Sequence, residues 1–193
     1  MKVVFAALFA LLLVSCADKA ANPNDLSSIP AKAPQWTEQP DINGRFSAAG
    51  GAAQSIGGAR FQQIEASAKA SDSLRVRIER IAIYAAKECL IAFRSKRAND
   101  AAIESDARLL SFMIGARSAV QFARVDNWWS PTGDYYALFR FPETTLKATI
   151  VDMIAQFVAS NESYSANFDM LRGLELIENA AIKAIEAAKQ EDR

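Results

Sequence analysis

The sequence predicts an α+β fold, in which a small antiparallel sheet (β-α-α-β-β-α order) carries long helices on one face and a further helix follows at the C-terminus. Three observations support this fold. Residues 59–97 contain no proline or glycine, and apolar side chains recur there at three- and four-residue spacing. Residues 120–141 are rich in aromatic side chains and surround a Ser-Pro-Thr-Gly turn, which is typical of a β-hairpin. Residues 45–53 are rich in small side chains, as in a strand that packs closely under a helix.

The composition excludes several classes of function. The chain has 193 residues, which suits one domain with appendages, and 22 basic side chains balance 22 acidic ones. This balance leaves no excess of Lys and Arg, so we expect no nucleic-acid partner. The chain has no histidine, which removes imidazole metal ligands and the Ser-His-Asp and Cys-His catalytic groups. We therefore expect no enzyme activity, no cofactor, no metal site and no small-molecule substrate.

The N-terminus has the pattern of a secretory signal. Lys2 precedes twelve apolar residues, Val3 to Val14, which are too few to span a bilayer as a helix and suit the core of a signal peptide. The run ends in Leu-Val-Ser-Cys at residues 13–16, which resembles the lipobox of bacterial lipoproteins. The alternatives are a plain secretory signal with a chance cysteine, or a buried core helix. The lipobox interpretation makes residues 1–15 a signal peptide and Cys16 the site of lipid attachment, and Ala17 after it favours the outer membrane.

A tether is expected over residues 16–40. Four of the six prolines fall there among polar residues, and no apolar period is sustained. Trp36 is the exception, since a large aromatic side chain in such a segment usually packs onto something. It either covers the edge of the folded domain or contacts a membrane surface or a partner.

The folded domain is expected over residues 41–158, with a helical extension at 159–193. A second helix is expected near residues 101–116, and another begins at Pro142-Glu143, where proline suits the first turn. Cys89 lies on the apolar stripe of the long helix, so we expect a buried core residue and no nucleophile. The extension has a heptad-like apolar stripe, which either packs back onto the domain or joins a partner helix.

The hairpin holds the candidate interaction residues. Trp128, Trp129, Tyr135 and Tyr136 surround one turn, and Trp and Tyr dominate binding hot spots. The alternative is that half of them cover the core of the sheet and the rest form ordinary cross-strand pairs. The second arm places Tyr135 and Tyr136 on opposite faces.

These features together resemble the Lpp-twenty-type family of bacterial surface lipoproteins, which includes outer-membrane lipoproteins of the flagellar apparatus. The resemblance covers about residues 35–157. It combines the lipobox and tether with Pro-Gln-Trp at residues 34–36, the small-residue strand FSAAGGA, the long alanine-rich helix and the hairpin. The hairpin positions that fit are Val125, Trp128, Gly133, Tyr136 and Leu138. The resemblance implies a compact unit with helices on one sheet face and a structural or adhesive role, and it carries over no catalytic residues.

The sequence therefore predicts an outer-membrane lipoprotein that acts by binding and assembly at the cell surface, with a flagellar association implied by the resemblance. The alternative is a periplasmic lipoprotein regulator that binds an envelope enzyme such as a cell-wall synthase. In both interpretations the membrane is a partner through N-terminal acyl chains. Protein partners are also expected, further copies of the chain among them.

Overall fold

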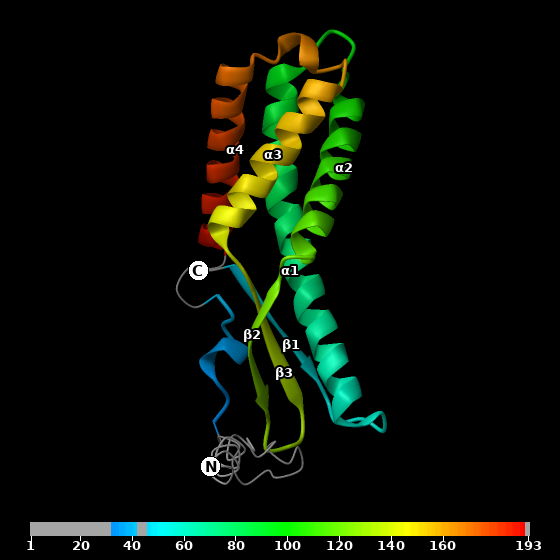
Figure 1. Cartoon of the computed structure of the whole chain (residues 1–193), viewed down its shortest axis with the longest axis vertical. Coiled ribbons are helices and arrows are strands. Elements are labelled where there is room, and N and C mark those ends of the chain that lie inside the picture. Colours follow the sequence, from blue (N-terminus) through cyan, green and yellow to red (C-terminus); the bar gives the residue numbers. More distant parts are fainter. Residues whose placement is uncertain (1–31, 42–45, 192–193) are drawn as a thin grey trace, which may run out of the picture.

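A three-stranded antiparallel sheet and four helices form the α+β fold of the computed structural model, which describes residues 32–41 and 46–191 (Figure 1). The elements in chain order are η2 (Gln35–Thr37), β1 (Phe46–Ala52), α1 (Gly58–Phe93), α2 (Asp100–Ala119), β2 (Ala123–Trp129), β3 (Tyr135–Phe141), α3 (Glu143–Ser160), η3 (Ser165–Asn167) and α4 (Met170–Glu191). The predicted fold class and element order are confirmed.

The sheet has β3 at its centre, in the order β1-β3-β2. The predicted hairpin joins β2 to β3 through a turn in which the Ser130 amide donates to the Asp134 carbonyl at 2.8 Å. Gly133 has a φ of +87°, a conformation that favours glycine. A bulge interrupts β2 between Arg124 and Asp126.

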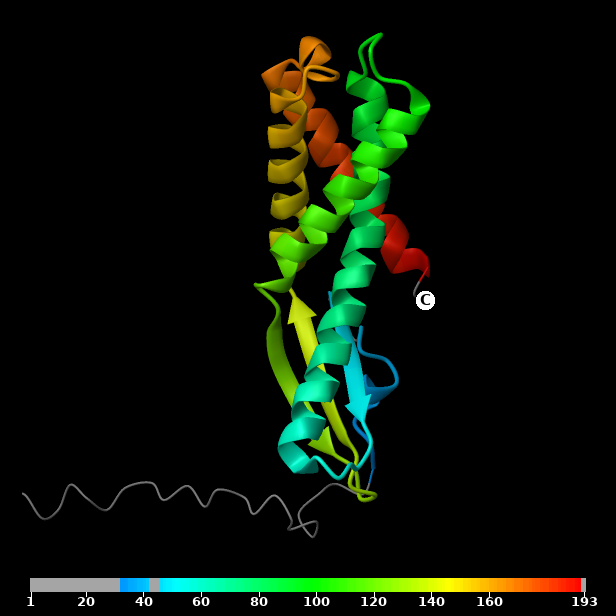
Figure 2. The same cartoon turned by 90° about the vertical axis from the view of Figure 1, so that its right-hand side faces the viewer.

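Helix α1 joins the two halves of the molecule. Its 36 residues span about 54 Å at 1.5 Å per residue. The first half lies across one face of the sheet, and the second half packs among the other helices (Figures 1 and 2). Close packing on the sheet requires Gly50, because a Cβ there would lie 2.2 Å from the carbonyl oxygen of Ala66 and 2.5 Å from the amide nitrogen of Ala70. The small-residue strand therefore has the packing role predicted for it.

A four-helix bundle stands beyond one end of the sheet and is formed by the second half of α1 with α2, α3 and α4 (Figure 1). Helix α2 begins where the Asn99 side chain accepts a hydrogen bond from the Ala102 amide at 2.8 Å. Pro142 immediately precedes α3, close to the predicted start. The main core runs continuously from Phe46 and Phe141 of the sheet into this bundle. One apolar core thus connects the two halves.

The folded unit is wider than the sequence-based boundaries. Helix α4 packs back onto α1 and α3, and its Ile177, Ala181 and Ile185 belong to the main core. At the other end of the chain, η2 packs on the sheet. Both segments therefore lie inside the folded unit, in place of the boundaries expected at residues 40 and 158.

Within the described residues, no helix combines the length and the apolar character needed to cross a membrane.

Candidate interaction surfaces

The four hairpin aromatics divide between the two faces of the sheet. Trp129 and Tyr135 are register partners on the face that α1 covers, with ring centroids 4.7 Å apart. Trp128 and Tyr136 are partners on the opposite face, with centroids 5.4 Å apart. The alternation predicted for the second arm is confirmed, and each pair is a cross-strand aromatic contact of the kind that stabilises hairpins.

Tyr135 belongs to the core and is not available to a partner. Its side chain is 2% exposed and packs with Ala52, Ala66 and Ala137 under the first half of α1. Burial raises the pKa of its phenol, and the nearby Arg124 guanidinium opposes that shift. The expectation that Tyr135 is an interaction residue is therefore corrected: its register places it beneath α1. Trp129 is half-buried beside it.

The opposite face of the sheet, here called the second sheet face, carries Trp128, Tyr136 and Leu138, and η2 covers part of it. In Figure 1, η2 and α1 lie on opposite sides of the sheet. Trp36 is buried there, and its indole Nε1 donates to Asp126 Oδ2 at 2.8 Å. Trp36 thus covers the domain, as one of the two sequence-based interpretations proposed.

The second sheet face is only partly covered. Trp128 and Tyr136 keep part of their surface exposed. Trp128 Nε1 is buried, and none of the described residues offers it a hydrogen-bond acceptor. Strand β2 forms the outer edge of the sheet, and its residues 123–127 are exposed. An exposed edge strand beside half-exposed aromatic rings is a typical docking surface for a protein segment.

The carboxylates of the hairpin have structural partners. Asp126 accepts the hydrogen bond from Trp36, and Asp134 accepts one from the Thr132 hydroxyl at 2.8 Å within the turn. Among residues 32–41 and 46–191, no group of three acidic or cysteine side chains gathers closely enough to hold a metal ion. Asp126 therefore serves as a hydrogen-bond acceptor for Trp36, and Asp134 serves as an acceptor within the hairpin turn.

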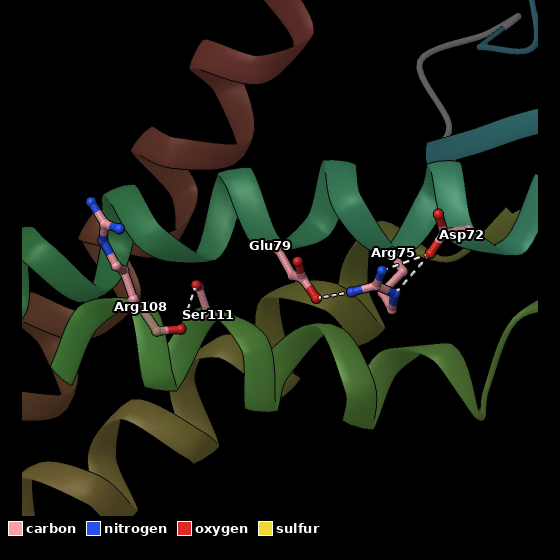
Figure 3. A network of polar contacts seen from close by, with 5 residues as sticks. All are labelled: Asp72, Arg75, Glu79, Arg108 and Ser111. Carbon is pink, nitrogen blue, oxygen red and sulfur yellow. Dashed lines mark hydrogen bonds and ion pairs between the residues drawn. The ribbon is translucent and has the colours of Figure 1, made fainter. Parts of the chain in front are cut away.

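A cluster of charged side chains lies along α1 where the helix meets α2 (Figure 3). The Arg75 guanidinium bonds Asp72 Oδ1 at 2.6 Å and also pairs with Glu79. The bond to Asp72 raises the pKa of Arg75. These are three- and four-residue neighbours on one helix, a spacing that stabilises the helix modestly.

Helix α2 approaches this cluster closely at Gly115. A Cβ on Gly115 would lie 2.4 Å from Glu79 Cγ, so the Glu79 side chain occupies the space that glycine leaves open. One turn away, the Ser111 hydroxyl donates to the Arg108 carbonyl of its own helix at 2.8 Å (Figure 3). The arrangement is that of a helix–helix contact, with every one of these groups satisfied inside the molecule.

A shallow hollow lies between α1 and α4, lined by Arg80, Tyr84, Ala188 and Glu191 among others. Its volume of about 30 Å³ is room for about two water molecules. The hollow is a seam between two packed helices.

The outward side of α2 exposes several large apolar side chains. We define the α2 outer face as Leu109, Phe112, Met113, Ala116 and Val120, which recur at three- and four-residue spacing along the helix. The exposed fractions of its large side chains are 50% for Leu109, 59% for Phe112, 43% for Met113 and 82% for Val120. In Figure 1, α2 is the outermost helix on the right, and no described element lies beyond it.

The inward side of α2 is apolar as well. Ile103, Ala107, Leu110 and Ile114 are buried in the main core. At 3.6 residues per turn, the α2 outer face lies on the opposite side of the helix. A helix that is apolar on two opposite sides belongs between two layers, and residues 32–41 and 46–191 supply only one of them.

Sequence reasoning missed the α2 outer face, although the signal was present. Leu109, Phe112, Met113 and Ala116 form a second apolar period beside the inward one. Cys16, the predicted site of lipid attachment, lies outside the described residues. Comparisons with protein-family models, curated proteins and solved structures found no match for the chain.

Proposed function

We propose that the chain is an outer-membrane lipoprotein, anchored by acyl chains at Cys16, that assembles with other copies of itself as a structural element of the cell surface. In this role it binds and assembles without catalytic turnover. The resemblance to the Lpp-twenty-type family gives the proposal its most concrete setting, which is an assembly associated with the flagellum.

The observation that carries the proposal is the α2 outer face. Large contiguous apolar patches on a folded protein mark surfaces that contact a protein or a membrane. The sequence of residues 2–16 supports the anchor, because a short apolar run that ends in Leu-Val-Ser-Cys is the pattern that directs acylation. Single acyl chains bind membranes only marginally, so an anchor of two or three chains would make attachment lasting.

A second candidate is a lipoprotein regulator that docks on an envelope enzyme such as a cell-wall synthase. The second sheet face favours it, because Trp128 and Tyr136 are half-exposed there beside the open edge of β2. Such a surface would bind a single partner protein other than a copy of this chain.

The experiment that separates the two candidates is in-cell cross-linking of the tagged full-length chain, followed by identification of the cross-linked proteins. Assembly with copies of itself gives a ladder of multiples of the chain. A single dominant complex with one envelope enzyme, without a ladder, would replace the structural role with the regulatory one.

The anchor is tested in the same cells with a clickable fatty acid. Cys16→Ala is expected to abolish acyl labelling and to remove the chain from the outer-membrane fraction. Cys89→Ala is the matched control. Because Cys89 is fully buried, this variant should leave labelling unchanged. Continued labelling of Cys16→Ala would show that the lipid is attached elsewhere or that the signal is of another kind.

A further inference from the structure

We propose that the α2 outer face is the contact between copies of this chain, and that two α2 helices pair there in antiparallel orientation about a two-fold axis between Phe112 and Met113. This inference rests on the proposed function, in which copies assemble, and it assigns the surface that they use.

The apolar side chains of the face are self-complementary in this arrangement. With the axis between Phe112 and Met113, Leu109 of one copy lies at the height of Ala116 of the other. Phe112 then faces Met113 of the second copy. Large side chains thus meet small or flexible ones, as two-fold interfaces between identical surfaces require.

Charges at one flank of the face favour the same arrangement. Asp106 and Arg117 both lie on that flank, eleven residues apart, so a two-fold antiparallel pair places Asp106 of one copy near the height of Arg117 of the other. Arg117 is exposed and forms no ion pair within the described residues, and Asp106 accepts a hydrogen bond from the Tyr164 hydroxyl at 2.7 Å. The contact would therefore bring two opposite-charge pairs together at its edge.

The other flank holds no like-charge conflict. Arg108 of one copy lies near the height of Gly115 of the other, and Gly115 has no side chain. A membrane surface is a poorer occupant, because seating the apolar side chains in lipid would bring the Asp106 carboxylate toward the headgroup phosphates, which carry the same sign of charge.

Site-specific disulfides in the full-length chain test the pairing directly. The chain is expressed in bacteria so that it reaches the cell envelope, and the two cysteine variants carry different tags. Leu109→Cys and Ala116→Cys lie at the same height across the proposed contact. The two Leu109 positions differ in height by about 10 Å, beyond the roughly 4–7 Å between Cα atoms that a disulfide allows. Cells that express both variants should therefore form about tenfold more cross-linked dimer than cells that express either variant alone.

Matched controls separate this contact from chance collision. Leu171→Cys, at a more exposed position on α4, should form no dimer with Ala116→Cys. The unsubstituted chain should form none either, because Cys89 is buried. A two-fold contact joins the copies in pairs. Leu109→Asp should therefore strongly reduce the dimer among the in-cell cross-links, whereas Leu171→Asp should keep it.

Three results would overturn the proposal. Equal disulfide yield from Leu109→Cys alone would exclude the antiparallel register. Absence of disulfide with a cross-linked dimer that survives Leu109→Asp would move the contact to another surface, although assembly itself would stand. Cross-linking of the Leu109→Cys thiol to a photoactivatable phospholipid, without disulfide, would make the face a membrane contact.

Discussion

At the scale of single residues, the Cys89 thiol makes the stability of the fold depend on pH in the alkaline range. Its side chain is fully buried in the core, and burial raises the pKa from the ordinary value of 9.0 to about 12, with Glu88 adding to the effect. A raised pKa in the folded state means that stability is complete below the unfolded-state value and is lost as pH rises toward the folded-state value. We expect the free energy of unfolding to fall by about 3 kcal/mol between pH 9 and pH 12 through this group.

Urea denaturation at a series of pH values measures this loss. Cys89→Ala removes the titrating group while keeping a small apolar side chain, so its stability should fall less steeply over the same pH window. Tyrosines contribute to both proteins equally, because burial and the bond to Asp106 raise the pKa of Tyr164 in each. Parallel pH profiles for the two proteins would contradict the prediction.

Trp36 and Trp128 form a matched pair for measuring one hydrogen bond. Trp36 Nε1 donates to Asp126, whereas Trp128 Nε1 has no acceptor in the part of the chain that the structure describes. We expect Trp36→Phe to cost about 1 kcal/mol more than Trp128→Phe, because only the first change removes a bond. Thermal or urea unfolding measures the difference. Equal costs would mean that the indole of Trp36 contributes through its packing alone.

At the scale of elements, the packing of β1 under α1 depends on Gly50. Gly50→Ala places a Cβ against the backbone of α1, which can move only as a whole helix. Gly51→Ala is the control on the opposite face of the same strand, where the new Cβ would meet the Tyr136 ring at 2.9 Å, and a side chain can rotate. We expect Gly50→Ala to cost about 3 kcal/mol and Gly51→Ala clearly less.

Urea denaturation measures this difference as a shift in the unfolding midpoint of each glycine variant, while the dependence of the unfolding free energy on urea concentration stays unchanged. A Gly51→Ala variant that is the less stable of the two would mean that Tyr136 holds its position more firmly than α1 does.

The elements also show which parts of the structure a sequence can predict. Strand β3 has a single alternating period, so the separation of Tyr135 from Tyr136 could be predicted. Which of the two faces lies under α1 could not, because that choice depends on packing between distant segments. Trp36 and Asp126 are 90 residues apart, and no local pattern pairs them. Helix α2 has two apolar periods, and a sequence does not say which one the core takes.

At the scale of the whole molecule, the continuous core and the single long α1 predict one cooperative unfolding transition. All three tryptophans, Trp36, Trp128 and Trp129, belong to the sheet end of the molecule. Most of the helical residues, which give the far-UV circular dichroism signal, lie in the bundle. Tryptophan fluorescence and far-UV circular dichroism therefore report on opposite ends. We expect their urea transitions to coincide, because α1 contributes to both ends. Separate midpoints would show that the sheet end unfolds by itself.

The way residues 32–41 are attached has a mechanical consequence. This segment lies along the sheet, and Trp36 is its first buried side chain. Asp41 follows, pairs with Arg77 of α1 and accepts a hydrogen bond from the Ser47 amide at 2.9 Å. A pull on the chain from its N-terminal side meets Trp36 first and the Asp41–Arg77 pair second, before it reaches β1. The first load therefore falls on strand β2 through the bond from Trp36 to Asp126, and the load that passes beyond Trp36 enters the longest helix through Arg77.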